Sequence, residues 1–146
     1  MRHRQELETS LGRGFTLIEI MIVVAIITIL AGIAYPSYRS QIVKGNRAAA
    51  QGYMMSLSSR EEQIMLDNRA YKAAANTAAI AGVSGLISVP SEVSRHYGLR
   101  IESPNPGTPA LPSYLITATP IAGGVQATDG NLTLDSTGAK TPAAKW

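Results

Sequence analysis

Hydrophobic residues are concentrated near the start of the chain, in a run that extends from Gly14 to Tyr35. A run of this length can cross a bilayer as a helix, and its strongly apolar side chains together favour insertion by about 4 to 7 kcal/mol. Its one charged residue, Glu19, opposes insertion by about 3 kcal/mol. The pattern therefore predicts a membrane-inserted helix whose carboxylate needs a compensating partner.

The helical pattern continues beyond the apolar run, with apolar residues restricted to one side. From Tyr38 to Tyr71 they recur at helical spacing, which predicts an amphipathic helix that packs in a core. A single helix from Phe15 to about Asn68 would be about 80 Å long, far longer than a bilayer is thick. Because Pro36 has no backbone donor, we expect a kink or local unwinding there. The expected core residues on this helix are Ala50, Tyr53, Met54, Leu57, Ile64 and Met65.

The remainder of the chain loses the helical period. Residues 72–95 are rich in Ala, Gly and Ser, which predicts a connecting loop with a short helix at about 76–81. Further along, apolar and polar residues alternate, which predicts half-buried antiparallel strands. The alternating stretches are 97–102, 114–119 and 131–135.

Turn residues separate these strands. Prolines crowd the stretch from Ser103 to Pro112, which predicts a long hairpin loop. Asp129-Gly130 and Thr137-Gly138 predict tight turns. The sequence therefore predicts an α+β fold, in which the C-terminal half of a long helix packs on a small antiparallel sheet so that both apolar faces are buried.

Composition limits the chemistry that this chain can perform. It has 146 residues, a net charge of +3 and no cysteine, which excludes disulfides, thiolate metal sites and a thiol nucleophile. Of its two histidines, His3 lies in the N-terminal segment and His96 has no cysteine or paired carboxylates near it in sequence. We therefore expect no enzyme active site, no cofactor and no metal ion.

One polar stretch resembles a calcium-binding loop only superficially. Asp129, Asn131, Thr133 and Asp135 have the alternation of such a loop, but Leu134 occupies the position where a calcium loop needs glycine. The same spacing of two places polar side chains on the solvent face of a strand, which is the interpretation we adopt. Residue 131 also begins a three-residue glycosylation sequence, a pattern that arises often by chance.

Two ordinary interpretations of the N-terminal segment compete with a more specific one. Gly32 and Ala34 are spaced like a signal-peptidase site, but the apolar run is longer than that of a signal peptide and contains Glu19. A plain membrane anchor would leave Gly14 and Glu19 unexplained.

The sequence Gly14-Phe15-Thr16-Leu17-Ile18-Glu19, followed by the apolar run and Pro36, resembles the prepilin signature of type IV pilins and of the pseudopilins of secretion systems. This resemblance implies that prepilin peptidase cleaves between Gly14 and Phe15 and N-methylates Phe15, leaving the head outside the inner membrane. Near the positive end of the helix dipole Glu19 would be partly compensated, and in an assembly it can pair with the amine of Phe15 of a neighbouring subunit, which sets the axial register.

The head resembles the PilE-type minor pilins in three segments, Asn68 to Tyr71, Tyr114 to Pro120 and Asp129 to Trp146. Many pilins close the C-terminal region with a disulfide, and here Asn131 and Lys145 stand where the cysteines would be. We expect packing of Trp146 to hold this region instead.

The resemblance gives the expected organisation and partners. The chain would be a structural subunit of a type IV pilus, held in the inner membrane before assembly and in an extracellular fibre afterwards. Its partners would be prepilin peptidase, the inner-membrane assembly machinery and other pilins, with a pseudopilin of a type II secretion system as the alternative. The expected parts are a removed leader (1–14), a transmembrane and assembly helix (15–37), and a head (38–146) made of an amphipathic helix half (38–71), a loop (72–95) and a sheet with a C-terminal loop (96–146).

Nucleic acid is a further possible partner, since some minor pilins with such heads are DNA-uptake receptors. From residue 72 onward, five basic residues face four acidic ones, a balance of 5 − 4 = +1, and phosphate-backbone binding would need a denser stripe of positive charge. DNA binding is therefore kept as an alternative that depends on clustering in space. The residues that could cluster are Arg95, Arg100, Lys140 and Lys145.

Overall fold

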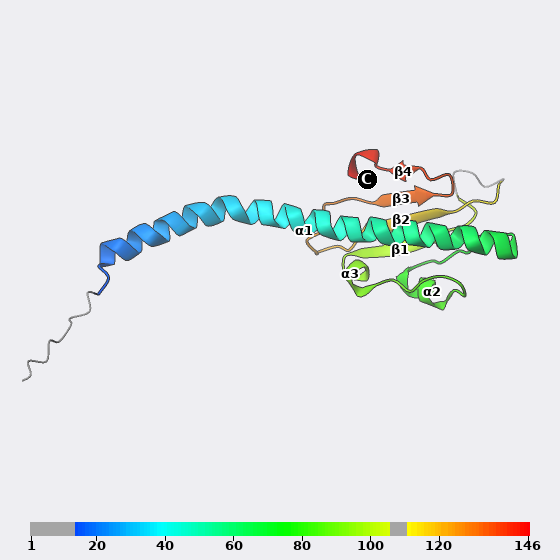
Figure 1. The fold of residues 1–146 in the computed structure, drawn as a ribbon, viewed down its shortest axis with the longest axis horizontal. Helices are drawn as coiled ribbons and strands as arrows, with labels where there is room; N and C mark the ends of the chain where they lie inside the picture. The colour runs from blue at the N-terminus through cyan, green and yellow to red at the C-terminus, as the bar shows by residue number, and fades with distance from the viewer. Residues whose placement is uncertain (1–13, 106–110) are drawn as a thin grey trace, which may run out of the picture. The chain divides into compact units, whose positions relative to one another are not determined.

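The computed structural model of the chain describes residues 14–105 and 111–146. Contacts within the chain divide it into two compact units, residues 1–38 and residues 39–146. The elements along the chain, as drawn in Figure 1, are α1 (Leu17–Asn68), α2 (Thr77–Gly82), α3 (Ser91–Ser94), β1 (Tyr97–Glu102), β2 (Leu115–Pro120), β3 (Leu132–Asp135), β4 (Lys140–Thr141) and a 3-10 helix, η1 (Ala143–Lys145).

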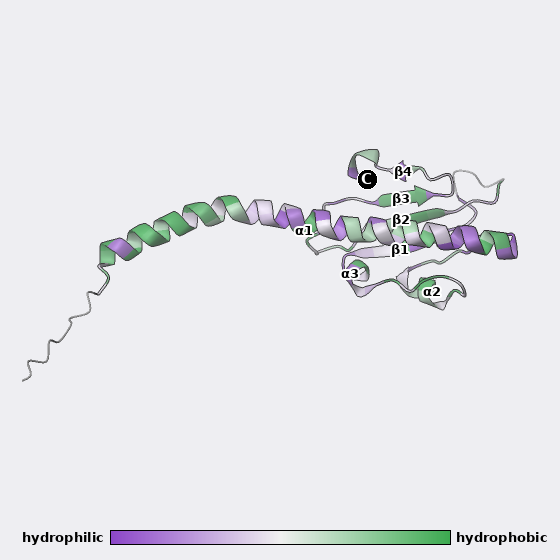
Figure 2. Ribbon diagram, viewed as in Figure 1, coloured by the Kyte–Doolittle hydropathy of each residue, from purple (hydrophilic) through white to green (hydrophobic). Residues whose placement is uncertain are grey.

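The described part of the first unit is the N-terminal portion of α1 and the residues just before it. Apolar residues cover this portion of α1 on all sides, which Figure 2 shows as an almost continuous green stretch. α1 is assigned as helix without interruption through Pro36, so the expected local unwinding is not present. The expected kink at Pro36 stays a prediction.

The second unit contains a four-stranded antiparallel sheet in the order β1-β2-β3-β4. Ile101 pairs with Ile116, and Ile116 pairs with Leu134, so apolar side chains form a row across three strands. All three are buried. A bridge between Ala74 and Ile101 attaches the segment after α1 to the free edge of β1.

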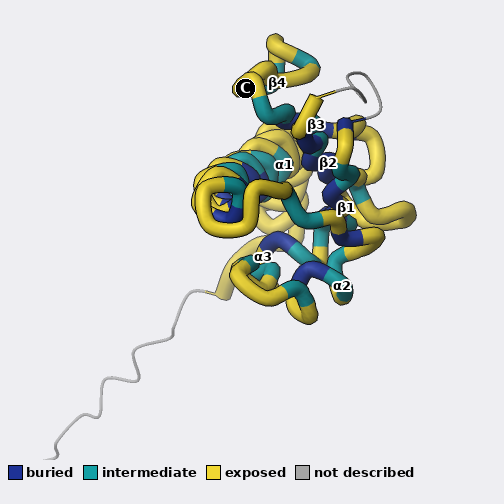
Figure 3. Tube along the Cα trace, turned by 90° about the vertical axis from the view of Figure 1, so that its right-hand side faces the viewer, coloured by how far each residue is buried: buried dark blue, intermediate teal, exposed yellow. Residues whose placement is uncertain are grey.

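The core of this unit lies between the sheet and the part of α1 beyond residue 49. Figure 3 shows the buried residues on the sides of these two elements that face each other. Five of the six expected core residues of the helix are buried. The prediction for Met65 is wrong, because this residue is only half-buried. Glu61 takes a place in the buried stripe instead, at helical spacing from Leu57 and Ile64. The buried residues of α1 are Ala50, Tyr53, Met54, Leu57, Glu61 and Ile64.

The helix ends where the sequence predicted. Asn68 is the last residue of α1, and Arg69 then adopts a left-handed conformation with φ of 56°. This change of backbone direction ends the helix, as a residue with positive φ commonly does at a helix C-terminus. The short helix expected at 76–81 is α2, with Asn76 capping it through a hydrogen bond from the Ala79 N–H at 2.9 Å.

The predicted α+β fold is confirmed, and the differences concern very short elements. Three of the strands were expected, but α3 has four residues and β4 has two. Elements of that length are too short to show a hydrophobic period, so α3 and β4 could not be predicted from one. The two predicted tight turns are present, with φ of 78° at Gly130 and 82° at Gly138. Part of the expected hairpin loop from Ser103 to Pro112 lies outside the described residues.

Candidate functional site

The N-terminal portion of α1 presents its apolar side chains outward. From Phe15 to Ile33 the large hydrophobic residues are between 46% and 82% exposed, and none of the most apolar window of α1 is buried. It is the one helix of the described residues that is long and apolar enough to cross a membrane. A surface of this kind needs lipid or other protein around it, because water disfavours so much apolar area.

A short polar motif starts this helix. The Oγ1 atom of Thr16 accepts a hydrogen bond from the backbone N–H of Glu19 at 3.3 Å, which satisfies one of the free donors at the helix start. The pattern Thr-x-x-Glu at residues 16–19 is that of a capping box, a sequence signal that predicts a helix N-terminus. A role was predicted for Glu19 from the sequence, but the capping role of Thr16 was not.

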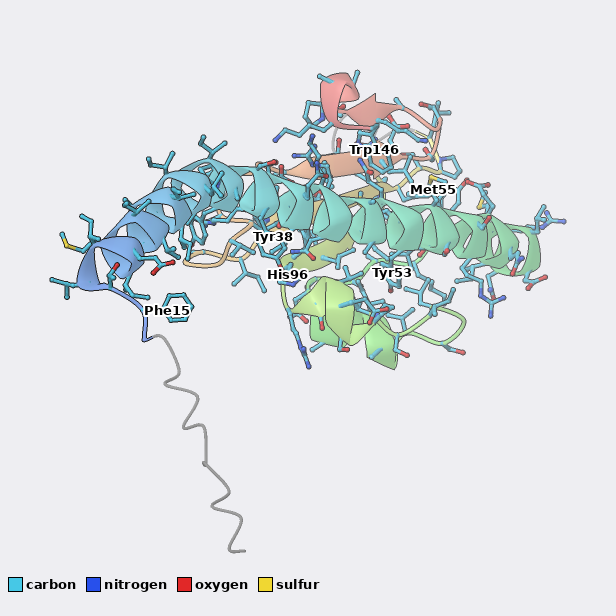
Figure 4. All side chains as sticks on the ribbon, turned by 60° about the vertical axis from the view of Figure 1, so that its left-hand side comes forward. Phe15, Tyr38, Tyr53, Met55, His96 and Trp146 are labelled. Carbon is cyan, nitrogen blue, oxygen red and sulfur yellow. The ribbon has the colours of Figure 1, made fainter. Side chains whose placement is uncertain are left out.

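The residues of the expected cleavage site precede the helix. Phe15 is 77% exposed and lies on the segment that leads into α1 (Figure 4). A Cβ atom added to Gly14 would meet no atom of the described residues within 4 Å, its chain neighbours aside. The described part of the chain therefore gives no packing reason for glycine at position 14. The expected leader, apart from Gly14, lies outside the described residues.

In the second unit, a buried polar cluster joins α1 to the loop between β2 and β3. The side chain of Asp129 is only 2% exposed, and Arg47 of α1 donates to both of its carboxylate oxygens. The Tyr97 hydroxyl also donates to Asp129, and Lys145 approaches it at 3.7 Å. Gln126 donates to the Val43 carbonyl at 2.8 Å, which attaches the same loop to α1 a second time. We call Arg47, Tyr97, Gln126, Asp129 and Lys145 the Asp129 cluster.

The charges of the Asp129 cluster are set by these contacts. Burial alone would raise the pKa of Asp129, but hydrogen bonds from Arg47 and Tyr97 and the positive charge of Arg47 outweigh it and lower the pKa to about 2. The hydrogen bond to Asp129 raises the pKa of Arg47. Burial raises the pKa of Tyr97 to about 12, so its hydroxyl keeps the proton that it donates.

The Asp129 cluster corrects the prediction made from the sequence for the region from Asp129 to Asp135. Asp129 was expected on the solvent face of a strand, and that is wrong: it precedes β3 and is buried because a cation and a hydroxyl group surround it. Asn131 is exposed and Leu134 is buried in β3. Asp135 accepts hydrogen bonds from the backbone N–H groups of Thr137 and Ala139, both at 2.9 Å, so it holds the turn before β4.

The C-terminal segment is held without a disulfide. Trp146 is half-buried and packs against the core, as expected, and the Lys140 ammonium lies 4.9 Å from the centre of its ring. Figure 4 shows Trp146 and Met55 on the side of the sheet where β4 lies. Gln51 of α1 donates to the Lys145 carbonyl at 2.6 Å. Trp146 packing is therefore confirmed, but the contacts of Lys145 with Gln51 and Asp129 also contribute.

A second buried acid lies in the core. Glu61 is fully buried, and its Oε2 atom accepts a hydrogen bond from the Lys72 N–H at 2.9 Å. Among the described residues its Oε1 atom has no hydrogen-bond partner. Burial raises the pKa of Glu61, the Lys72 N–H partly opposes this, and the neighbouring charge of Glu62 adds to it.

The remaining sequence candidates do not come together into a site. His96 is half-buried between α3 and β1, and its backbone carbonyl accepts from the Ile121 N–H at 2.9 Å. Arg100 is exposed on β1 and pairs with Glu102 at 3.3 Å. Lys140 contacts Trp146 and Lys145 belongs to the Asp129 cluster, so Arg100, Lys140 and Lys145 have three different sets of contacts in the head. Within the described residues, no group of three histidine or carboxylate side chains is placed to hold a metal ion.

A long helix that is apolar and exposed at its start and packed on an antiparallel sheet further along is the arrangement of a type IV pilin. Comparison with known families agrees. Residues 11–35 match the prokaryotic N-terminal methylation motif, and residues 36–133 match the family described as type IV minor pilin ComP, DNA uptake sequence receptor. The chain belongs to this family of type IV minor pilins. Pilins are structural, non-enzymatic proteins.

Individual relatives support the same class. The chain is 35% identical over 83 residues to the type IV wide pilus major component PilA4 of Thermus thermophilus, which covers 57% of this chain and 61% of the relative. It is 41% identical over 90 residues to the type IV major fimbrial protein FimA of Dichelobacter nodosus, and the aligned part is 62% of this chain and 52% of that relative. A third relative is the type II secretion system core protein G of Pectobacterium carotovorum, which is 39% identical over 59 residues. The aligned part is 40% of this chain and 38% of that relative. The chain thus spans less than two thirds of the length of each of these relatives.

Proposed function

We propose that this minor pilin is made as a membrane-inserted precursor, cleaved between Gly14 and Phe15, N-methylated on Phe15, and built into a type IV pilus through the apolar portion of α1. One observation carries the proposal: the outward-facing apolar side chains of residues 15–33. In a bilayer they contact lipid, and in a bundle of subunits they contact each other. The same surface therefore serves storage in the membrane and assembly in the fibre.

Glu19 has a specific part in this scheme. In the described residues its carboxylate forms no ion pair, and it lies in the first turn of α1, where the helix dipole partly compensates its charge. Cleavage before Phe15 creates a free amine four residues earlier on the chain. Pairing of that amine with Glu19 of a neighbouring subunit would neutralise both charges only at one axial offset, so Glu19 would set the register of assembly.

The partners and locations follow from the same scheme. Prepilin peptidase would act on the cytoplasmic side of the inner membrane, and the head would lie on the other side. The inner-membrane assembly machinery would then move the subunit into a fibre made with other pilins. The match of residues 11–35 to the N-terminal methylation motif supports processing by this peptidase.

Fibre isolation tests the proposal. Fibres are sheared from cells that express the chain at its natural level, and the subunit is analysed by intact-mass spectrometry. We expect residues 15–146 carrying one additional methyl group. A subunit that begins at Met1 or is cut beyond Ala34 contradicts the proposed processing. A correctly processed subunit that is absent from fibres and present in a secretion complex supports the pseudopilin alternative.

Binding of duplex DNA is a second candidate function, and the family match favours it. The matched family is described as a DNA uptake sequence receptor, and the match covers most of the head. Residues 39–146 contain ten basic and seven acidic residues, a formal balance of 10 − 7 = +3. This excess is modest, so we expect weak binding that depends strongly on salt.

A salt titration tests this second function. The full-length chain in detergent micelles is mixed with a fluorescent duplex, and anisotropy is measured at increasing sodium chloride concentration. Affinity that falls steeply with salt supports DNA binding, and a preference for one duplex over a shuffled duplex of equal composition supports a receptor role. Absence of binding at the lowest salt concentration removes this function and leaves the structural one.

A further inference from the structure

The excess positive charge of the head is gathered at one end. Five basic residues lie where the second unit begins and where the β2–β3 loop and the chain terminus meet α1; they are Arg39, Lys44, Arg47, Arg95 and Lys145. Glu92 and Asp129 are the acidic residues there, so the balance is 5 − 2 = +3. The charges of the other five basic and five acidic residues of this unit cancel one another. We call these five basic residues the basic end.

Hydrogen bonds within the second unit place this end relative to α1. Gln126 donates to the Val43 carbonyl at 2.8 Å, and Arg47 pairs with Asp129, so the β2–β3 loop lies against the first turns of α1 in this unit. The Ile121 N–H donates to the His96 carbonyl at 2.9 Å, which places Arg95 beside the start of the same loop.

Three of these cations are available to a partner. Arg39, Lys44 and Arg95 are exposed, and none of them forms an ion pair with another described residue. Two aliphatic side chains of the loop are also exposed, Ile121 at 42% and Val125 at 37%. The surface therefore combines unpaired positive charge with apolar side chains.

This combination lies close along the chain to the membrane-spanning segment. Arg39 follows Tyr35, the end of the apolar run, by four residues, and Lys44 follows it by nine. So few intervening residues keep both cations within reach of the phospholipid headgroup layer and its electric field. Aromatic residues such as Tyr35 and Tyr38 are typical of the membrane interface.

We propose that the head of the unassembled subunit rests on anionic phospholipid through Arg39, Lys44, Arg95 and the loop residues Ile121 and Val125. Phosphate groups would neutralise the cations, and the interface would accept the two aliphatic side chains. A duplex DNA backbone offers phosphates but no apolar counterpart for Ile121 and Val125. The seated head is a storage state, which the subunit leaves when it enters the fibre.

The inference rests on membrane insertion of α1, which the proposed function requires, so the test measures insertion separately. The chain has no cysteine, so single cysteines can be introduced and labelled with an environment-sensitive fluorophore. A label at Ile26→Cys reports insertion of α1 into the bilayer. A label at Val125→Cys reports contact of the head with the membrane surface, which we call seating. Leu66→Cys is the control at the far part of α1, where Leu66 is 83% exposed and about 35 Å from Val43 along the helix.

Each variant is reconstituted as the full chain into vesicles of phosphatidylcholine alone or mixed with phosphatidylglycerol. Quenching lipids carry the quencher either in the acyl chain or at the headgroup. We expect acyl-chain quenching at position 26 in both vesicles. Headgroup quenching at position 125 is expected in the anionic vesicles only, and none at position 66. High salt should remove the signal at position 125 and leave that at position 26 unchanged.

Charge variants make the test specific. Replacing Arg39, Lys44 and Arg95 with glutamine should lower the equilibrium constant for seating by roughly 100-fold, since each cation near an anionic surface contributes about fivefold. The same change at Arg60, Arg69 and Lys72 alters net charge equally and should leave seating intact.

Two results overturn the inference while leaving the proposed function standing. One is equal headgroup quenching at positions 125 and 66 in a chain that is inserted at position 26. The other is protection of the position 125 label from an aqueous quencher by duplex DNA and not by anionic vesicles, which would assign the basic end to nucleic acid. Loss of quenching at position 26 itself would instead contradict membrane insertion and hence the proposed function.

Discussion

Arg47 forms an ion pair with the buried Asp129 although 82 positions separate them in the sequence. The pair joins α1 to the loop between β2 and β3, and Tyr97 from β1 donates to the same carboxylate. Three separate segments of the head are therefore fixed to one acidic side chain. In this chain, which has no cysteine, the Asp129 cluster is a non-covalent connection between the C-terminal region and the helix.

Replacing Asp129 with asparagine should destabilise the head. The change leaves Arg47 without its counter-ion, and because the Arg47 side chain is 20% exposed we expect a cost of about 2 kcal/mol, less than for a fully buried pair. Thermal unfolding of the full-length chain in detergent, followed by near-ultraviolet circular dichroism, measures the effect. Asp67→Asn is the matched control, because Asp67 is exposed on α1 and should change stability by less than about 0.5 kcal/mol. Equal stability of the two variants would show that the cluster contributes nothing.

The same carboxylate should make the head sensitive to acid. The pKa of Asp129 is about 2 in the folded chain, and the ordinary value is about 3.9. Because folding lowers this pKa, the contribution of Asp129 is fully present above about pH 4 and is lost as the pH falls toward 2. Stability measured from pH 6 downward should fall more steeply in the wild-type chain than in Asp129→Asn. Parallel curves would contradict the assignment.

Glu61 should have the opposite pH dependence. Burial raises its pKa, so its ionised form opposes folding, and this penalty grows as the pH rises above the ordinary value for a glutamate. Glu61→Gln keeps an acceptor for the Lys72 N–H and should stabilise the head at pH 7 by on the order of 1 kcal/mol. Melting temperatures of both chains at pH 7 and pH 4 test this. A gain that does not shrink at pH 4 would show that ionisation of Glu61 is not its cause.

Gly14→Ala should block processing without disturbing the fold. Among the described residues, no atom beyond the adjoining residues lies within 4 Å of a Cβ added at position 14, so we expect recognition by the peptidase to respond and the fold to be unchanged. We expect the variant to retain residues 1–14, which a gel shift and the intact mass both detect. Gly45→Ala is a suitable control, since it also has open space around its added Cβ and should be processed normally. Normal processing of the Gly14 variant would place the cleavage elsewhere.

Glu19→Ala should separate processing from assembly. Because the proposed partner of Glu19 is the terminus of a neighbouring subunit, cleavage should continue while the amount found in sheared fibres falls on the order of tenfold, or about 1.4 kcal/mol per subunit. Thr28→Ala is the control, because Thr28 is polar but already donates to the Val24 carbonyl at 2.8 Å within its own helix. Fibre incorporation of the Glu19 variant equal to that of the control would exclude a register role.

Elements whose cause is local could be predicted from the sequence. The long helix, its end at Asn68 and three strands follow from hydrophobic periods of 3.6 and 2, which neighbouring residues set among themselves. The prepilin signature around Gly14 and Glu19 is likewise a contiguous pattern, and it indicated the class of protein. Thr16 could have been found in the same way, since the capping pattern is written in four consecutive residues.

Tertiary structure decided what depends on distant partners. Asp129 has the same neighbours in sequence whether it is exposed or buried, and only the arrival of Arg47 and Tyr97 makes its burial favourable. The burial of Glu61 and the gathering of charge around Lys44 and Arg95 also result from how the helix packs on the sheet. Hydrophobic periodicity indicates which face of a helix or strand is buried. The energy of a buried charge depends instead on its partners, which are brought together only by the tertiary fold.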